Sequence, residues 1–295
     1  MIPPRTEQAH PAHERLDEYA VRELVDALIE DQAVAAAAVR DAAAQIARAV
    51  EGAVSRLESG GRIIYVGAGT SGRLGLLDSV ELNPTFSWPS GRSIALLAGG
   101  PPAIHAAVEG AEDDLEQGGR DLANLQPEPC DVVVLLAASG ATPYTLGALA
   151  AARAAGAFTI GIANNPGSPL AAEADTGITL DTGPEVISGS TRLKAGTAQK
   201  IALNTFSSAV MVRLNKVFGN LMVDLRPTNA KLVRRAIRLV ALAAGTDEAR
   251  AQAAFEGCDR QVKPAIVSLL KAIGPDQARE RLAANRGSVR AALQD

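Results

Sequence analysis

The sequence predicts an α/β fold: a doubly wound parallel sheet with N-terminal helices and a small C-terminal helical region. Two observations carry this prediction. In the middle of the chain, short apolar runs of strand length alternate with segments of helix length. The run Val132–Leu136 is apolar without a break, which suits a parallel strand covered by helices on both faces.

The elements follow in order along the 295 residues, a length that allows about two domains. A proline-containing arm, residues 1–15, precedes helical spacing over 18–57, and Gly60-Gly61 then marks a helix end. Strands are predicted at 63–66, 94–97, 132–137, 159–163 and 178–180, and helices at 194–214 and beyond 227. We therefore divide the chain into an arm with helices (1–52), an α/β domain (53–216) and a C-terminal helical region (217–295).

Composition narrows the class of function. Lys and Arg total 29 against 33 Asp and Glu, and aromatic residues make up 3%, so we expect no nucleic-acid partner. Cys130 and Cys258 lack metal-ligand spacing, so neither a metal site nor a disulfide framework is predicted. With no leader segment and no apolar run long enough to cross a bilayer, we expect a cytoplasmic protein without membrane contact.

Three loops rich in glycine and hydroxyl groups are candidate ligand sites: residues 67–73, 139–142 and 188–191. Loops of this kind aim backbone N–H groups, hydroxyl oxygens and a helix N-terminus at one point, as a phosphate or carboxylate requires. In a parallel sheet they gather where the strands end. The alternative is that these Ser and Thr residues are ordinary helix N-caps. Lys194, beside the third loop, either neutralises a bound anion or decorates a helix surface.

The first loop also fits the dinucleotide pattern G-x-G-x-x-G at Gly67, Gly69 and Gly72. However, the second predicted strand is followed by Ala98-Gly99-Gly100 instead of the acidic residue that the pattern needs, and Arg73 stands where a P-loop has lysine. We therefore predict no nucleotide cofactor.

Two groups of carboxylates are candidates for acid–base chemistry. Pro84 predicts a helix end near Glu81, where the helix dipole and nearby Asp78 would raise the Glu81 pKa, although an ordinary solvated glutamate is the simpler interpretation. Glu109, Glu112, Asp113 and Glu116 have helical spacing and read as an acidic helix face.

Four separated segments give the chain a close resemblance, over nearly its whole length, to the N-acetylmuramic acid 6-phosphate etherase family of the sugar isomerase (SIS) superfamily. They are Gly67-Ala68-Gly69-Thr70-Ser71-Gly72-Arg73-Leu74-Gly75, Val108-Glu109-Gly110-Ala111-Glu112-Asp113, Lys194-Ala195-Gly196-Thr197-Ala198-Gln199-Lys200, and Gly219-Asn220-Leu221-Met222-Val223-Asp224 with Thr228-Asn229.

The resemblance implies a homodimer that cleaves the D-lactyl ether of N-acetylmuramic acid 6-phosphate without metal or redox cofactor during cell-wall recycling. Glu112 is then the base at C2, and Glu81 the acid that protonates lactate and activates water. The implied phosphate and sugar ligands are Thr70, Ser71, Ser139, Thr142, Ser190 and Thr191, with Lys231 as a further candidate.

The chain departs from the family pattern at three places. Leu82-Asn83 replaces Cys-Pro after Glu81, Ala141 replaces the arginine of the second loop, and His10 precedes Pro11 in the arm. Two other functions remain open: a sugar-phosphate isomerase, which needs no proton donor to an ether oxygen, and a non-catalytic sugar-phosphate sensor, which needs neither Glu81 nor Glu112.

Overall fold

The computed structural model describes residues 4–225, 227 and 229–294. The chain forms two compact units: unit 1 comprises Met1–Val80 with Ser90–Ser208, and unit 2 comprises Glu81–Pro89 with Ala209–Asp295. Each unit is described by itself. Within the described residues, none of the helices combines the length and the apolar character needed to cross a bilayer.

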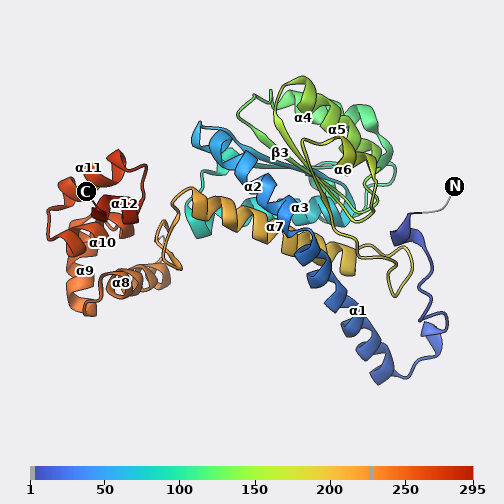
Figure 1. The fold of residues 1–295 in the computed structure, drawn as a ribbon, viewed down its shortest axis with the longest axis horizontal. Helices are drawn as coiled ribbons and strands as arrows, with labels where there is room; N and C mark the ends of the chain where they lie inside the picture. Colours follow the sequence, from blue (N-terminus) through green and yellow to red (C-terminus); the bar gives the residue numbers. More distant parts are fainter. Residues whose placement is uncertain (1–3, 226, 228, 295) are drawn as a thin grey trace. The chain divides into compact units, whose positions relative to one another are not determined.

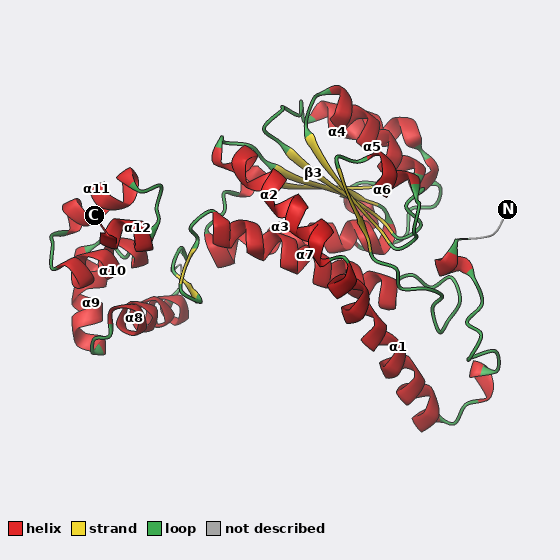
Figure 2. Ribbon diagram, viewed as in Figure 1, coloured by secondary structure: helices red, strands yellow, loops and turns green. Residues whose placement is uncertain are grey.

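Unit 1 is built on a five-stranded parallel sheet in the order β2-β1-β3-β4-β5 (Figure 2). Its strands are β1 (Ile63–Gly67), β2 (Ser93–Leu97), β3 (Val132–Ala137), β4 (Phe158–Ala163) and β5 (Thr176–Thr179). In the register, Val133 lies opposite both Ile64 and Thr159. The predicted parallel sheet is confirmed, although the fifth strand begins two residues earlier than the sequence indicated.

Helices cover both faces of this sheet, as the apolar strands require (Figure 1). They are α1 (Val21–Asp41), α2 (Ala43–Glu58), α3 (Gly69–Phe86), α4 (Leu115–Asn124), α5 (Pro143–Ala154), α6 (Pro169–Glu173) and α7 (Lys194–Arg213), with 3₁₀ turns η1 (Arg5–Glu7), η2 (Leu16–Glu18), η3 (Ser90–Arg92), η4 (Pro101–Ile104) and η5 (Ala111–Asp113). Leu122 of α4 and Tyr144 of α5 pack with Ile64 and Val133 in one buried cluster, while α2, α3 and α7 lie on the other face.

The predicted end of α3 near Glu81 is wrong, because the helix continues through Pro84 to Phe86. Proline removes one backbone hydrogen bond, and this loss falls close to the helix end. Two bonds then close the terminus: Ser87 N–H donates to Asn83 O (2.9 Å), and the Asn83 side-chain amide donates to Trp88 O (2.8 Å). Asp78, which was expected to face Glu81, is 3% exposed and accepts a hydrogen bond from the Tyr65 hydroxyl.

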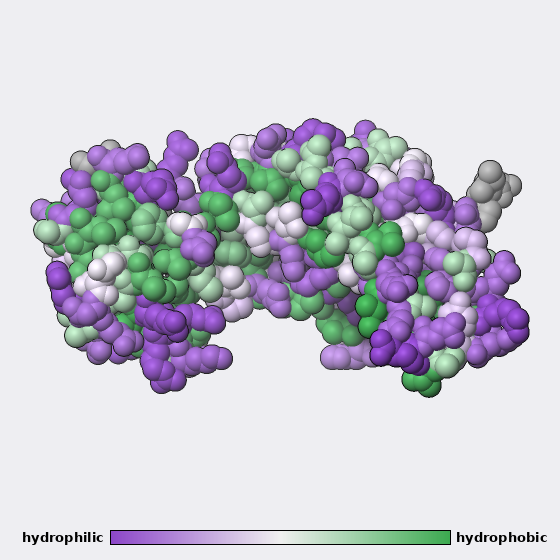
Figure 3. Space-filling view, turned by 60° about the horizontal axis from the view of Figure 1, so that its bottom comes forward, coloured by the Kyte–Doolittle hydropathy of each residue, from purple (hydrophilic) through white to green (hydrophobic). Residues whose placement is uncertain are grey.

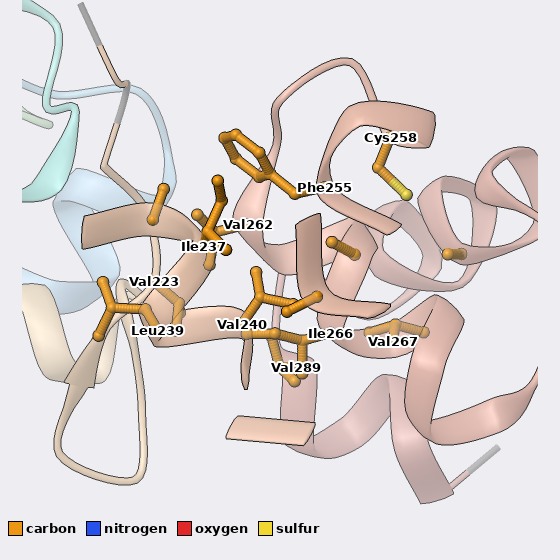
Figure 4. Close-up of a cluster of buried hydrophobic side chains, with 14 of the residues drawn as sticks. Val223, Ile237, Leu239, Val240, Phe255, Cys258, Val262, Ile266, Val267 and Val289 are labelled. Atoms are coloured by element: carbon orange, nitrogen blue, oxygen red, sulfur yellow. The ribbon is translucent and has the colours of Figure 1, made fainter. Parts of the chain in front are cut away.

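Unit 2 is mainly helical, as predicted for the chain beyond residue 227. After a hairpin of β6 (Val217–Phe218) and β7 (Leu221–Met222) come α8 (Ala230–Ala244), α9 (Glu248–Gly257), α10 (Val262–Lys271), α11 (Pro275–Ala284) and α12 (Val289–Gln294). Gly245 ends α8 with φ +63°, a left-handed conformation that glycine adopts readily. Unit 2 has its own apolar core, which includes Phe255, Val240 and Ile266 (Figure 4). This core holds the short helices together.

Candidate functional site

A cavity of about 450 Å³ lies in unit 1, lined by residues that follow β1 and β3. These strands are neighbours, and the strand order changes direction between them, which is where open α/β sheets bind ligands. The lining residues are Glu7, Ala68, Gly69, Thr70, Ser71, Glu112, Asp113, Leu136, Ala137, Ala138, Ser139, Ala141, Thr142, Pro143, Gly189 and Thr191. Residues from all three predicted loops therefore meet in one cavity.

The first loop turns tightly from β1 into α3. A Cβ on Gly67 would lie 2.8 Å from Gly72 N, and a Cβ on Gly72 would lie 2.5 Å from Gly67 O. Glycine at both positions lets the helix start directly against the strand. Thr70 and Ser71 stand in the first turn of α3 and line the cavity, so their hydroxyls and the backbone N–H groups of that turn lie together.

The second loop is held by its own hydroxyls. Ala141 N–H donates to Ser139 Oγ (3.1 Å), and Ser139 Oγ lies 3.4 Å from Thr142 Oγ1. Gly140 has φ +68°, and a Cβ there would lie 2.3 Å from the Ser168 side chain. Thr142 is the N-cap of α5, yet its side chain makes no capping hydrogen bond. The interpretation of this residue as an ordinary N-cap is therefore wrong, because its hydroxyl does not cap the first turn of α5.

The third loop contributes fewer hydroxyl side chains to the cavity than predicted. Thr191 lines the cavity, whereas Ser190 does not. The N-terminus of α7 is occupied by the buried Glu185 carboxylate, which accepts from Lys194 N–H (3.0 Å) and Ala195 N–H (2.9 Å). Burial raises the Glu185 pKa, and these N–H bonds oppose the rise. Because an internal carboxylate holds this helix end, the expectation that it points at a bound anion is wrong.

Lys194 is likewise not a ligand-facing cation. Its residue is 2% exposed, and its Nζ lies 2.5 Å from Asp31 Oδ1 on α1. Neither sequence interpretation of this lysine, anion partner or surface decoration, is correct. It pairs inside the protein, since a buried charge needs a partner.

Glu112 reaches the cavity from a 3₁₀ turn. The predicted acidic helix over 109–116 is wrong, because Gly110 with φ +74° starts η5 and α4 begins only at Leu115. The turn presents both Glu112 and Asp113 to the cavity.

The N-terminal arm supplies a third carboxylate, which the sequence analysis missed. Thr6 is fully buried, and its Oγ1 accepts from the Asn165 side-chain amide (2.9 Å). Arg5 pairs with Asp181 at 2.5 Å. These contacts hold η1 so that Glu7 lines the cavity. Nothing local in the sequence marks Glu7, because its place depends on the contact between Thr6 and the distant Asn165.

The electrostatics of the cavity are unusual for an anion site. Three lining residues are acidic, and no Lys or Arg is found among the described residues that line it. Positive potential comes instead from the N-termini of α3 and α5, each worth about half an elementary charge. The cavity therefore combines N–H groups and hydroxyls, which can bind a phosphate, with three carboxylates, which can transfer protons.

Two predicted site residues do not line this cavity. Glu81 is an exposed residue of α3, ten positions beyond Ser71, and is grouped with unit 2. Ten helical residues correspond to about 15 Å of axial rise. Lys231 is the exposed second residue of α8, also in unit 2. Thr228, from the same family-like segment, lies outside the described residues.

The five-stranded parallel sheet, with hydroxyl-rich loops at its carboxyl edge, has the architecture of an SIS domain. Family models agree: residues 45–153 match the glucokinase regulatory protein N-terminal SIS domain, and residues 104–209 match the SIS domain. Whole-length comparison is more specific. The chain is 57% identical to the N-acetylmuramic acid 6-phosphate etherase of Deinococcus radiodurans, over 99% of this chain and 95% of that protein.

Relatives with the same name come from Rubrobacter xylanophilus (51% identity, covering 98% of this chain and 95% of the relative) and Yersinia pestis (49%, covering 98% of each). The chain belongs to the N-acetylmuramic acid 6-phosphate etherase family.

Proposed function

We propose that this protein cleaves the D-lactyl ether of N-acetylmuramic acid 6-phosphate, giving N-acetylglucosamine 6-phosphate and D-lactate in cytoplasmic cell-wall recycling. The observation that carries the proposal is the 57% identity to an etherase over nearly the full length. The cavity supports it, because phosphate-binding groups and a carboxylate line the same space.

The reaction follows from the chemistry of the open-chain sugar. The aldehyde at C1 acidifies the C2 proton, which the Glu112 carboxylate removes. The electron pair forms the C2–C3 double bond as the C3–O bond breaks, and the Glu81 carboxyl protonates the departing lactate oxygen. Glu81 then takes a proton from water as the oxygen adds to C3, and Glu112 returns its proton to C2. One water is consumed, and no metal or redox cofactor is required.

The three hydroxyl-rich loops are proposed to bind the substrate. The hydroxyls of Thr70, Ser71, Ser139 and Thr142 and the N-termini of α3 and α5 are proposed to hold the phosphate and sugar. Thr191 and Ser190 complete the set from the third loop. Lys231 is kept as a proposed ligand on the basis of the resemblance alone. The three-part division of the chain at residues 52 and 216, which rests on the pattern of elements in the sequence, also remains a proposal.

We also propose a homodimer in which Glu81 serves the cavity of the second copy. The rise of about 15 Å between Ser71 and Glu81 along α3 supports this arrangement. On α1, Val21, Val25 and Ile29 are 79%, 44% and 65% exposed and share one helix face. Such a stripe is typical of a protein interface, and Figure 3 shows green apolar residues exposed among the purple surface.

The first experiment measures D-lactate release from N-acetylmuramic acid 6-phosphate, with the unphosphorylated sugar as control. We expect release from the phosphorylated sugar alone. Aldose–ketose interconversion without lactate would identify an isomerase instead, and binding without any turnover would identify a sensor.

A mixed-dimer experiment tests the shared site. Glu81→Gln and Glu112→Gln homodimers should each be inactive. A heterodimer of the two variants contains one cavity with both native carboxylates if Glu81 acts on the partner's cavity, so about half of the wild-type activity should return. No recovery in verified heterodimers would place both residues in one chain.

A further inference from the structure

Unit 2 contains a second cavity, and none of the described residues that line it is among those proposed for the etherase reaction. It measures about 730 Å³, and its lining includes four basic residues, Lys216, Arg260, Lys263 and Arg279, and two acidic ones, Asp224 and Asp259. The surplus of two positive charges matches a phosphomonoester, which carries about −1.5 to −2 near neutral pH.

The acidic side chains nearby do not neutralise all of these positive charges. Lys216 and Lys263 share a single carboxylate oxygen, Asp224 Oδ2, at 2.5 and 3.2 Å. The Lys263 side chain is 12% exposed, so its charge is poorly solvated. Arg279 is neutralised by Asp259 (2.6 Å) and Asp276 (2.7 Å). The exposed Arg260 guanidinium has no acceptor among the described residues.

Neutral donors point to the same kind of ligand. The N-terminus of α10 lines the cavity through Gln261, Val262 and Lys263, and no described side chain caps it. A helix N-terminus is a favourable place for phosphate.

We propose that this cavity is a second binding site for a phosphomonoester. Arg260 and Lys263 bind the phosphate oxygens, and the first turn of α10 supplies neutral hydrogen bonds. The site is separate from the lining of the unit 1 cavity, and it gives unit 2 the means to sense a phosphorylated metabolite.

The chain contains a reporter for this site. Trp88 is the single tryptophan, is 3% exposed, and follows Ser87 in the sequence. We would titrate the full-length protein with N-acetylglucosamine 6-phosphate and with inorganic phosphate, and follow Trp88 fluorescence. Calorimetry on the same samples would give the stoichiometry. Unphosphorylated N-acetylglucosamine is the ligand control.

We expect two phosphomonoester sites per chain, with Kd values below about 1 mM, and a saturable change in Trp88 emission. Arg260→Gln should weaken the Trp88-reported binding by about tenfold or more, because a charge-assisted contact is lost. Lys263→Met, which keeps the volume and leaves Asp224 paired with Lys216, should do the same. Arg235→Gln, an exposed α8 variant away from the cavity, should change nothing.

Ser139→Ala/Thr142→Ala should remove the calorimetric site of unit 1 and leave the Trp88 response intact. A response to inorganic phosphate as strong as to the sugar phosphate would identify the phosphate group alone as the recognised feature. One site per chain in the wild type, or unchanged binding in both Arg260→Gln and Lys263→Met, would overturn the proposal.

Discussion

The two cavities present opposite charge to a phosphorylated ligand. The cavity of unit 1 is lined by Glu7, Glu112 and Asp113 and by no basic residue among those described, whereas that of unit 2 is lined by two lysines and two arginines. In the proposed reaction, hydroxyls and helix N-termini bind the phosphate, and the carboxylates nearby transfer protons. A nearby lysine or arginine would pair with those carboxylates and lower their pKa values. The contrast therefore separates a site suited to catalysis from one suited to binding alone.

The largest effect should come from the catalytic carboxylate. Glu112→Gln is expected to reduce kcat for D-lactate release by about 10²–10⁴-fold, the usual contribution of a general base. Calorimetry should show product binding unchanged or tighter, because one negative charge near the phosphate is gone. Glu116→Gln is the matched control, since Glu116 is exposed on α4 and pairs with Arg120 at 3.0 Å. Equal losses in both variants would contradict the assigned role.

The second effect concerns loop shape. Gly140→Ala places a Cβ 2.3 Å from Ser168 at φ +68°, so the loop must move and kcat/KM should fall about 100-fold. Gly167→Ala is the control, because Gly167 also has a positive φ, +72°, but open space around it. That variant should lose only about 1–2 kcal/mol of stability and retain its activity. Thermal unfolding and lactate assays distinguish the two results.

A smaller effect is expected from a substitution that adds a positive charge to the unit 1 cavity and so makes it more like the unit 2 cavity. Ala141→Arg introduces a cation where none is present, and KM should fall about five- to tenfold through a charge-assisted hydrogen bond. The gain should shrink as ionic strength rises. Ala141→Met adds comparable bulk without charge and should not lower KM. If both variants bind substrate equally well, charge is not what this loop lacks.

The smallest effect is a pH dependence confined to unit 2. Burial lowers the Lys263 pKa below its ordinary value of 10.5, although Asp224 opposes the change. Anion binding favours charged Lys263, so Trp88-reported affinity should decline as pH rises through this lowered pKa. Lys263→Met should bind weakly without that alkaline decline. An identical pH profile in the wild type and in Lys263→Met would remove Lys263 from the site.

The sequence predicted the sheet and its loops well because their signals are local. The apolar run in β3 and the glycine spacing after β1 reflect short-range packing, and Thr70, Ser71, Ser139 and Thr142 follow directly from the loops that carry them. The five strands of the sheet lie where apolar runs were found: β3 has the predicted bounds, β1, β2 and β4 differ by one residue at one end, and β5 begins two residues earlier and ends one residue earlier.

The features that the sequence did not predict depend on contacts between residues that are far apart in the chain. Glu7 lines the cavity because Thr6 bonds Asn165, and Lys194 is buried because it pairs with Asp31. Neither contact has a periodic signal. The helix end at Glu81 was misplaced for another reason: proline is tolerated when it removes a single hydrogen bond near a terminus that other bonds close.

The same distant contacts have a consequence for synthesis of the protein. Thr6 cannot bond Asn165, and Asp31 cannot pair with Lys194, until the later residue of each pair has been synthesised. At about 5–20 residues per second, roughly ten to forty seconds of translation separate Thr6 from Lys194. During that interval the arm lacks its partners and the stripe of Val21, Val25 and Ile29 is uncovered. The cavity can close only after most of unit 1 has left the ribosome, so the nascent chain is most open to chaperones or premature association at its N-terminal end.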